Sequence, residues 1–214
     1  TDYVEIPATA NNPIVSGSAY NSYGCTLKVK DGAILTIPSG NSITVTNAVI
    51  VEPTGVFQLG NNASLVQINN VSNTGSIKYE RTANVRNLDY VYWSSPVSNM
   101  NIANLVSPLA FGPIYKWNPT VSNANGGQGN WESAYSDIML AAKGYIARSP
   151  SSFSSTVAQP LNATFIGTPN NGNITYTISR GTDTNTNYHV GNNGIEISNY
   201  SDNWNLIGNP YPSA

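Results

Sequence analysis

Two stretches of the chain decide the fold: ILTIPSGNSITV, residues 34–45, and VFQLGNNASLVQ, residues 56–67. A shift of 22 residues superimposes them, and apolar positions then coincide in three pairs: Leu35 with Phe57, Ile37 with Leu59, and Ile43 with Leu65. A repeat of this length is typical of a solenoid, in which stacked coils bury a shared apolar column. Short strands at such spacings also fit a β-meander, but the internal repeat favours the parallel β-solenoid.

The repeat continues beyond these two stretches. The same shift places Tyr79 over Phe57 and produces one mismatch, the polar Gln67 over Val45. Before residue 25 we expect only a short strand near Ile14. Apolar runs separated by Gly and Asn predict the other strands of a solenoid-like region over residues 1–80: 27–29, 34–37, 43–45, 49–51, 56–59, 65–68 and 77–79.

Aromatic residues concentrate after residue 90, where all four tryptophans lie. Short apolar segments bounded by Gly, Pro and Asn predict an antiparallel β-sandwich over residues 81–214. A segment at 136–142 predicts a short helix or helical turn. The expected strands are 90–93, 114–117, 144–148, 163–166, 174–178, 195–197 and 204–207. The predicted fold class is therefore all-β, a parallel solenoid-like region followed by a sandwich.

Charge is scarce along the whole chain. Charged residues make up 9% of it, against roughly 25% in an ordinary soluble domain, and the net charge is -2. A nucleic-acid partner normally requires a basic stripe, and no apolar run approaches the roughly 18 residues of a membrane span. We therefore expect neither nucleic-acid binding nor direct membrane insertion. The densest charge cluster, residues 78–89, is expected to be a solvated seam between the two β regions rather than a ligand site.

Few residues are available for catalysis. His189 is the only histidine and Cys25 the only cysteine, and the carboxylates form no close pair in the sequence. This composition argues against multi-histidine metal sites and against nucleophile–base arrangements. We predict no catalytic residues and therefore a protein that is not an enzyme.

One segment resembles a calcium loop. Asp183, Asn185 and Asn187 place side-chain oxygens at alternate positions, as calcium loops do. Tyr188 stands where the loop glycine belongs, and Gly194 stands where the bidentate acid belongs. The alternative is chance spacing in an Asn-rich chain. Calcium is the only cofactor that the sequence brings into consideration.

Exposed aromatic rings are the other candidate for ligand binding. Trp117 and Trp131, with the 118–130 loop, could stack on sugar rings. The alternative is that both rings belong to the sandwich core, the commoner fate of such aromatics. Trp93 and Trp204 lie inside apolar segments, and we expect both to be buried.

Six stretches resemble large secreted proteins of Bacteroidota, especially those of gliding flavobacteria that leave the cell through the type IX secretion system. These stretches are GNSITV (40–45), NNASLVQI (61–68), YERTA (79–83), DYVYWSSPV (89–97), KGYI (143–146) and WNLIGNPYPSA (204–214). The resemblance implies an extracellular or outer-surface location and a C-terminal sorting domain beyond residue 214. It carries no catalytic residues onto this sequence.

Together these observations predict a non-catalytic structural or adhesive module of a large secreted bacterial cell-surface protein. Its expected partners are other domains of the same long chain, with surface polysaccharide and secretion-system or outer-membrane proteins as further candidates. The alternative function is a carbohydrate-binding module of a secreted polysaccharide-degrading enzyme.

Overall fold

The computed structural model of the chain describes residues 3–105, 113–122, 128–181, 189–190, 196–197 and 204–213. Within these ranges the regular structure consists of β-strands and one short 3-10 helix, Ile102–Asn104, with no α-helix. No helix in the described ranges has the length and apolar character needed to cross a membrane.

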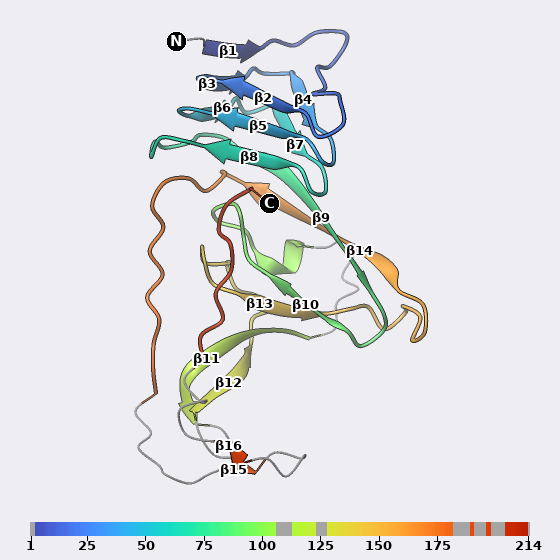
Figure 1. Cartoon of the computed structure of the whole chain (residues 1–214), viewed down its shortest axis with the longest axis vertical. Helices are drawn as coiled ribbons and strands as arrows, with labels where there is room; N and C mark the ends of the chain where they lie inside the picture. Colours follow the sequence, from blue (N-terminus) through green and yellow to red (C-terminus); the bar gives the residue numbers. More distant parts are fainter. Residues whose placement is uncertain are drawn as a thin grey trace.

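The first part of the chain winds into a parallel β-solenoid (Figure 1). The coils stack their strands into three parallel sheets, ordered β1-β3-β6, β4-β7-β9 and β2-β5-β8. The strands are β1 (Tyr3–Ile6), β2 (Asn21–Gly24), β3 (Thr26–Val29), β4 (Ile34–Ile37), β5 (Ser42–Val45), β6 (Val49–Val51), β7 (Val56–Leu59), β8 (Ser64–Gln67) and β9 (Ile77–Val85). Alternate side chains along these strands point into the coil and form its core, as the period of a strand requires.

The predicted 22-residue register is confirmed between the second and third coils. Three residue pairs lie opposite one another as the repeat requires: Leu35 with Phe57, Ile37 with Leu59, and Ile43 with Leu65. Val45 lies opposite Gln67, as the shift also predicted. The Gln67 amide is satisfied inside the coil because it exchanges two hydrogen bonds with the Asn73 amide, of 2.8 and 2.7 Å.

The register changes at the last coil, and the prediction of Tyr79 over Phe57 is wrong. Phe57 pairs with Ile77, and Tyr79 lies over Leu59, two residues from its predicted place. In the third coil, residues 52–55 form the corner between β6 and β7. In the last coil, Thr74 bridges to Ile50 of β6, and only residues 75–76 lie between Thr74 and the start of β9. A shift of two residues keeps inward side chains inward, so the core continues without interruption.

β9 carries the chain from the solenoid into the antiparallel part. Along its whole length β9 pairs antiparallel with β14 (Gln159–Gly167). A second antiparallel sheet has the order β10-β13-β11-β12. Its strands are β10 (Tyr90–Trp93), β11 (Ile114–Ser122), β12 (Gln128–Ser133) and β13 (Tyr145–Arg148). The all-β class, with a parallel solenoid followed by antiparallel sheets, is confirmed.

The two antiparallel layers share one core with the solenoid. Trp93 on β10 packs edge-on against Phe165 on β14, with ring centroids 6.1 Å apart. Buried residues of both parts belong to a single hydrophobic cluster. The expected boundary between residues 80 and 81 falls inside β9, so one continuous strand spans it.

Some expected elements are absent from the described residues. Residues 174–178 form no strand there, and the amide of Asn205 instead bonds both the N–H and the C=O of Ser179. Residues 204–207 make one isolated bridge, between Ile207 and Lys143. Residues 136–142 form no helix, and Ile138 among them bridges to Asn101. An alternating apolar pattern yields a strand only where a neighbouring edge is free to pair. The expected strand at 195–197 is present in part, as β16 (Glu196–Ile197) paired with β15 (His189–Val190).

Candidate functional site

Four aromatic side chains from separate parts of the chain meet on the antiparallel sheet. Tyr92 comes from β10, Trp117 from β11, Trp131 from β12 and Trp204 from the C-terminal segment. We call this group the aromatic platform. Together with Asn205 and Leu206 it lines a hollow of about 250 Å³.

Strand register places the two central rings. Trp117 and Trp131 are direct partners in the antiparallel β11–β12 pair. Their ring centroids lie 5.1 Å apart with planes at 74°, an edge-to-face arrangement. Such pairs are favourable by about 0.5–1.5 kcal/mol beyond the area that they bury. The edge of one ring is therefore held against the face of the other.

The C-terminal segment brings the third tryptophan to the platform. The indole nitrogen of Trp117 donates to the carbonyl of Trp204, at 2.8 Å. Gly144 lets this segment lie close to the sheet, because a Cβ atom there would stand 2.5 Å from Leu206 Cγ. The Gly144 N–H also donates to the Leu206 carbonyl, at 2.9 Å. Backbone contacts therefore fix the position of Trp204.

The platform is open to solvent. Tyr92 and Trp204 are each 66% exposed and Trp131 is 37% exposed, whereas Trp93 is 8% exposed. The prediction that Trp93 is buried is therefore confirmed, and the same prediction for Trp204 is wrong. Tyr92 and Trp93 are neighbours on β10 and face opposite sides of the sheet, one toward solvent and the other toward Phe165.

One glycine is required beneath the platform. Gly129 on β12 has φ +96, and a Cβ atom there would stand 2.2 Å from the ring atom Cζ2 of Trp117. We expect Gly129→Ala to displace the Trp117 ring and weaken the excitonic coupling between the two indoles. Circular dichroism of the aromatic couplet measures this change. An unchanged couplet in the Gly129→Ala protein would contradict the described packing.

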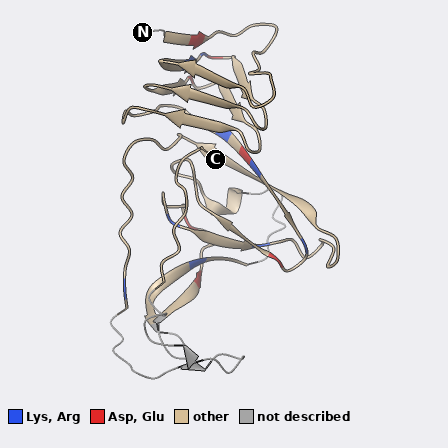
Figure 2. Ribbon diagram, viewed as in Figure 1, with Lys and Arg blue, Asp and Glu red and all other residues tan. Residues whose placement is uncertain are grey.

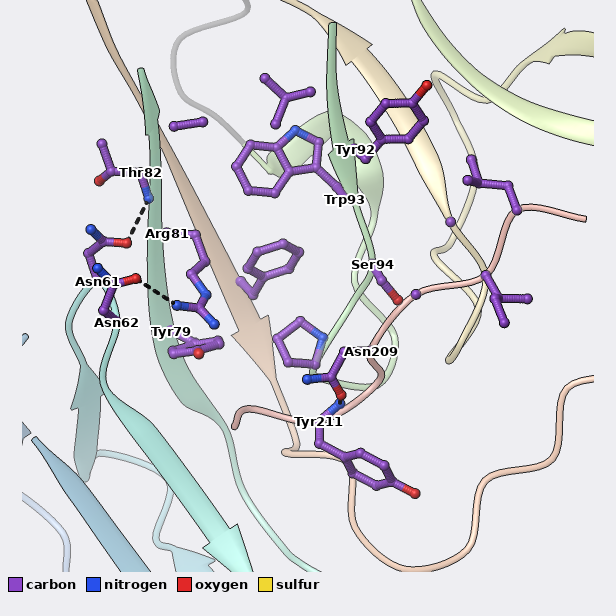
Figure 3. A pocket seen from close by; sticks show the side chains of 18 residues that line it. Asn61, Asn62, Tyr79, Arg81, Thr82, Tyr92, Trp93, Ser94, Asn209 and Tyr211 are labelled. Carbon is purple, nitrogen blue, oxygen red and sulfur yellow. Dashed lines mark hydrogen bonds between the residues drawn. The ribbon is translucent and has the colours of Figure 1, made fainter. Parts of the chain in front are cut away.

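A second hollow lies between the solenoid and the antiparallel sheets (Figure 3). Its volume is about 420 Å³, and we call it the junction pocket. Side chains from the corner between β7 and β8, from β9, from β10 and from the C-terminal segment surround it, among them Asn61, Asn62, Tyr79, Arg81, Trp93 and Asn209. The pocket therefore forms where four parts of the chain meet.

Arg81 supplies the charge in the junction pocket. Its guanidinium lies 4.8 Å from the centroid of the Tyr79 ring, a cation–π contact, and its Nη1 donates to Asn62 Oδ1 at 3.3 Å. Burial raises the pKa of the Tyr79 hydroxyl, and the Arg81 charge acts in the opposite direction. That hydroxyl donates to the carbonyl of Ala63 at 3.1 Å, so Tyr79 is neutral and fixed.

The charge cluster of residues 78–89 is spread along β9 and the turn that follows it (Figure 2). Lys78, Glu80 and Arg81 lie in β9 close to the solenoid, whereas Arg86 and Asp89 lie in the turn between β9 and β10. The cluster contains two ion pairs, between Lys78 and Glu80 at 2.8 Å and between Arg86 and Asp89 at 4.0 Å. Arg81 belongs to neither pair. One member of the cluster, Arg81, therefore lines a pocket, whereas the sequence predicted that the whole cluster is a solvated seam.

The other candidate residues are only partly covered by the structure. Asp183, Asn185 and Asn187 lie outside the described residues, and calcium binding there stays a prediction. The backbone of His189 lies in β15, but its side chain is outside the description. Within the described ranges, no three His, Cys, Asp or Glu side chains gather as a metal site would require. Cys25 is half-buried, and the Asn47 amide donates to its sulfur at 3.0 Å.

The fold and the site define a class: an all-β module that joins a parallel solenoid to antiparallel sheets and exposes an aromatic platform. The chain belongs to the family described as Domain of unknown function (DUF8693), which matches residues 1–214. Comparisons with curated proteins and with solved structures give no match.

Proposed function

We propose that this chain is a non-catalytic structural and adhesive module of a large secreted bacterial cell-surface protein, located at the outer cell surface. The aromatic platform carries the proposal, because it exposes large flat rings on a firmly packed all-β support. Flat apolar faces of sugar rings stack on such side chains. Surface polysaccharide is therefore the ligand class that we propose for the adhesive function.

The non-catalytic part of the proposal is supported by the use of the acidic side chains. Three described carboxylates are engaged in close ion pairs: Glu52 with Lys28 at 2.7 Å, Glu80 with Lys78 at 2.8 Å, and Asp137 with Lys116 at 2.7 Å. The Lys28 contact lowers the pKa of the Glu52 carboxyl, which keeps that group ionised. Carboxylates held in this way favour a structural role over proton transfer.

The open first coil supports the structural part of the proposal. The carbonyls of Ile6 and Gly24 accept hydrogen bonds from the second coil, at 3.0 and 2.9 Å. Because successive backbone groups of a strand point in opposite directions, those of Glu5 and Tyr23 point away from the solenoid. An unpaired sheet edge is a surface for pairing with a further strand. Another domain of the same long chain is the partner that we propose for this edge.

The secretory context of the proposal rests on the resemblance to large Bacteroidota proteins. Export through the type IX system, and contacts with secretion or outer-membrane proteins, are parts of the same proposal. The carbohydrate-binding module of a secreted polysaccharide-degrading enzyme is the second candidate function, and the same platform favours it. A catalytic domain encoded in the same gene would favour the enzyme module, whereas tandem β repeats would favour the surface protein.

The adhesive function is tested by retention on insoluble polysaccharides. We expect the wild-type protein to be retained on at least one of them and Trp131→Ala to be retained about tenfold less, equivalent to about 1.4 kcal/mol of binding. Tyr23→Ala is the matched control, because Tyr23 is an exposed aromatic residue of the first coil, remote from the platform. Equal retention of wild type and Trp131→Ala would contradict the proposal.

A further inference from the structure

The aromatic platform and the junction pocket are adjacent parts of one surface. Tyr92 and Leu206 line both hollows. The two hollows have volumes of about 250 and 420 Å³. A ligand that occupies both hollows would therefore pass Tyr92 and Leu206 on its way from the tryptophans to the pocket around Arg81.

The two ends of this surface differ in chemistry. The platform end is made of aromatic rings, whereas the pocket end carries a guanidinium and several side-chain amides. The side-chain oxygens of Asn61 and Asn62 accept hydrogen bonds from the Thr82 N–H and from Arg81. Their amide nitrogens point to no acceptor among the described residues and can donate to a ligand.

Arg81 has no carboxylate partner in the described part of the chain. The acids nearest to it in sequence are already paired, Glu80 with Lys78 and Asp89 with Arg86. A guanidinium presents parallel N–H donors that match the two oxygens of a carboxylate. In so sparsely charged a protein, an unpaired arginine in a pocket is complementary to a negatively charged ligand.

Two polar groups beside the junction pocket are buried without a hydrogen-bond partner among the described residues. They are the indole nitrogen of Trp93 and the hydroxyl of Ser94. Trp93 and Ser94 both line the junction pocket (Figure 3). Buried polar groups without partners are uncommon in native proteins.

We infer that the surface binds a uronic-acid-containing oligosaccharide, with sugar rings against the aromatic platform and a sugar carboxylate at Arg81. This inference rests on the proposed adhesive function and names its ligand class. A neutral oligosaccharide would satisfy the platform but leave the guanidinium without a counterion. Without a ligand at Arg81, the contact between Arg81 and Tyr79 would have only a structural role, which is to close the end of the solenoid core.

Two oligosaccharides with the same linkage test this inference: a β-1,4-linked mannuronate hexamer and β-1,4-mannohexaose. They differ in carrying a carboxylate or a hydroxymethyl group on each ring. We expect wild type to bind the mannuronate hexamer about tenfold more tightly in titration calorimetry. Because exposed charge interactions are screened by salt, raising the ionic strength should reduce that preference.

Variants separate the two ends of the surface. Arg81→Gln should weaken mannuronate binding about tenfold and leave mannohexaose binding unchanged, and Trp131→Ala should weaken both. Arg86→Gln is the matched control, because it removes the same charge from the exposed pair with Asp89. Thermal unfolding of Arg81→Gln checks that the variant folds. The comparison of the two ligands on wild type needs no variant.

The outcomes distinguish this inference from the proposed function. Equal affinity of wild type for the two hexamers, or equal weakening of both by Arg81→Gln, overturns the uronic-acid inference. In that case, weaker binding by Trp131→Ala would still support the adhesive platform. If wild type binds neither hexamer, the inference is overturned, while retention on insoluble polysaccharides decides the proposed function separately.

Discussion

Phe57→Ala is expected to lower the free energy of unfolding by about 3–5 kcal/mol, the usual cost of removing a buried phenylalanine ring. The ring is fully buried, and Phe57 lies between Leu35 and Ile77 in the stacked register. Removing it leaves a cavity between two coils that the flanking strands, fixed by their hydrogen bonds, cannot close. Denaturant unfolding measures the change.

The neighbouring residue provides the control for this prediction. Val56 belongs to the same strand but points away from the coil and is exposed. We expect Val56→Ala to change the free energy of unfolding by less than about 0.5 kcal/mol, as is usual for surface substitutions. Similar effects of the two substitutions would contradict the assignment of the inward face.

Gly75→Ala is the second substitution with a large expected effect. Gly75 has φ +78, and a Cβ atom there would stand only 1.9 Å from the carbonyl oxygen of Val51. The short last corner depends on this close approach. Because the backbone must shift and also keep a left-handed conformation, we expect a loss of about 2–4 kcal/mol in the free energy of unfolding.

Gly40→Ala separates the two causes. Gly40 has a similar φ of +76, but a Cβ atom there would have no neighbour within 4 Å. Gly40→Ala should lower the free energy of unfolding only by the penalty for holding alanine in a left-handed conformation, about 1–2 kcal/mol. Both variants are compared with wild type by denaturant unfolding. If Gly75→Ala cost no more than Gly40→Ala, the tight last corner would be contradicted.

The sequence repeat was enough to predict the middle of the solenoid but not its end. The 22-residue shift identified the stacking of Leu35 on Phe57 because both coils have corners of equal length. The last coil has a shorter corner at Gly75, and the apolar pattern carries no signal for a slip of two residues. Such a slip preserves the alternation from which strands are predicted.

The candidate site was predicted in part. Trp117 and Trp131 were named as candidates because exposed aromatic faces can stack on sugar rings, although burial in a core is the commoner fate of such residues. Trp204 was expected to be buried because its segment reads as an apolar strand. The segment instead crosses the sheet with a single bridge, at Ile207, and leaves the indole in solvent. Its position depends on a contact with Trp117 across 87 residues of chain, which no local pattern encodes.

Arg81 was missed for a different reason. It belongs to a cluster of charges, and clusters of this kind usually form solvated surfaces. Along β9, however, Arg81 follows the buried Tyr79 by two residues and therefore shares its face. The signal that could have identified it is this single cation in an inward-facing position. Recognising it requires knowledge that β9 runs past the end of the solenoid core.

The central claim, that the aromatic platform is the binding surface, is tested most directly by NMR of the four indole N–H groups during titration with an oligosaccharide that the protein retains. If the platform is the binding surface, the indole N–H signals of Trp117, Trp131 and Trp204 shift in proportion to the fraction of protein that has ligand bound. A ligand confined to the platform leaves the signal of Trp93 in place, whereas one that also fills the junction pocket moves it together with the other three. Saturation by the ligand with the three platform signals unmoved would contradict the account.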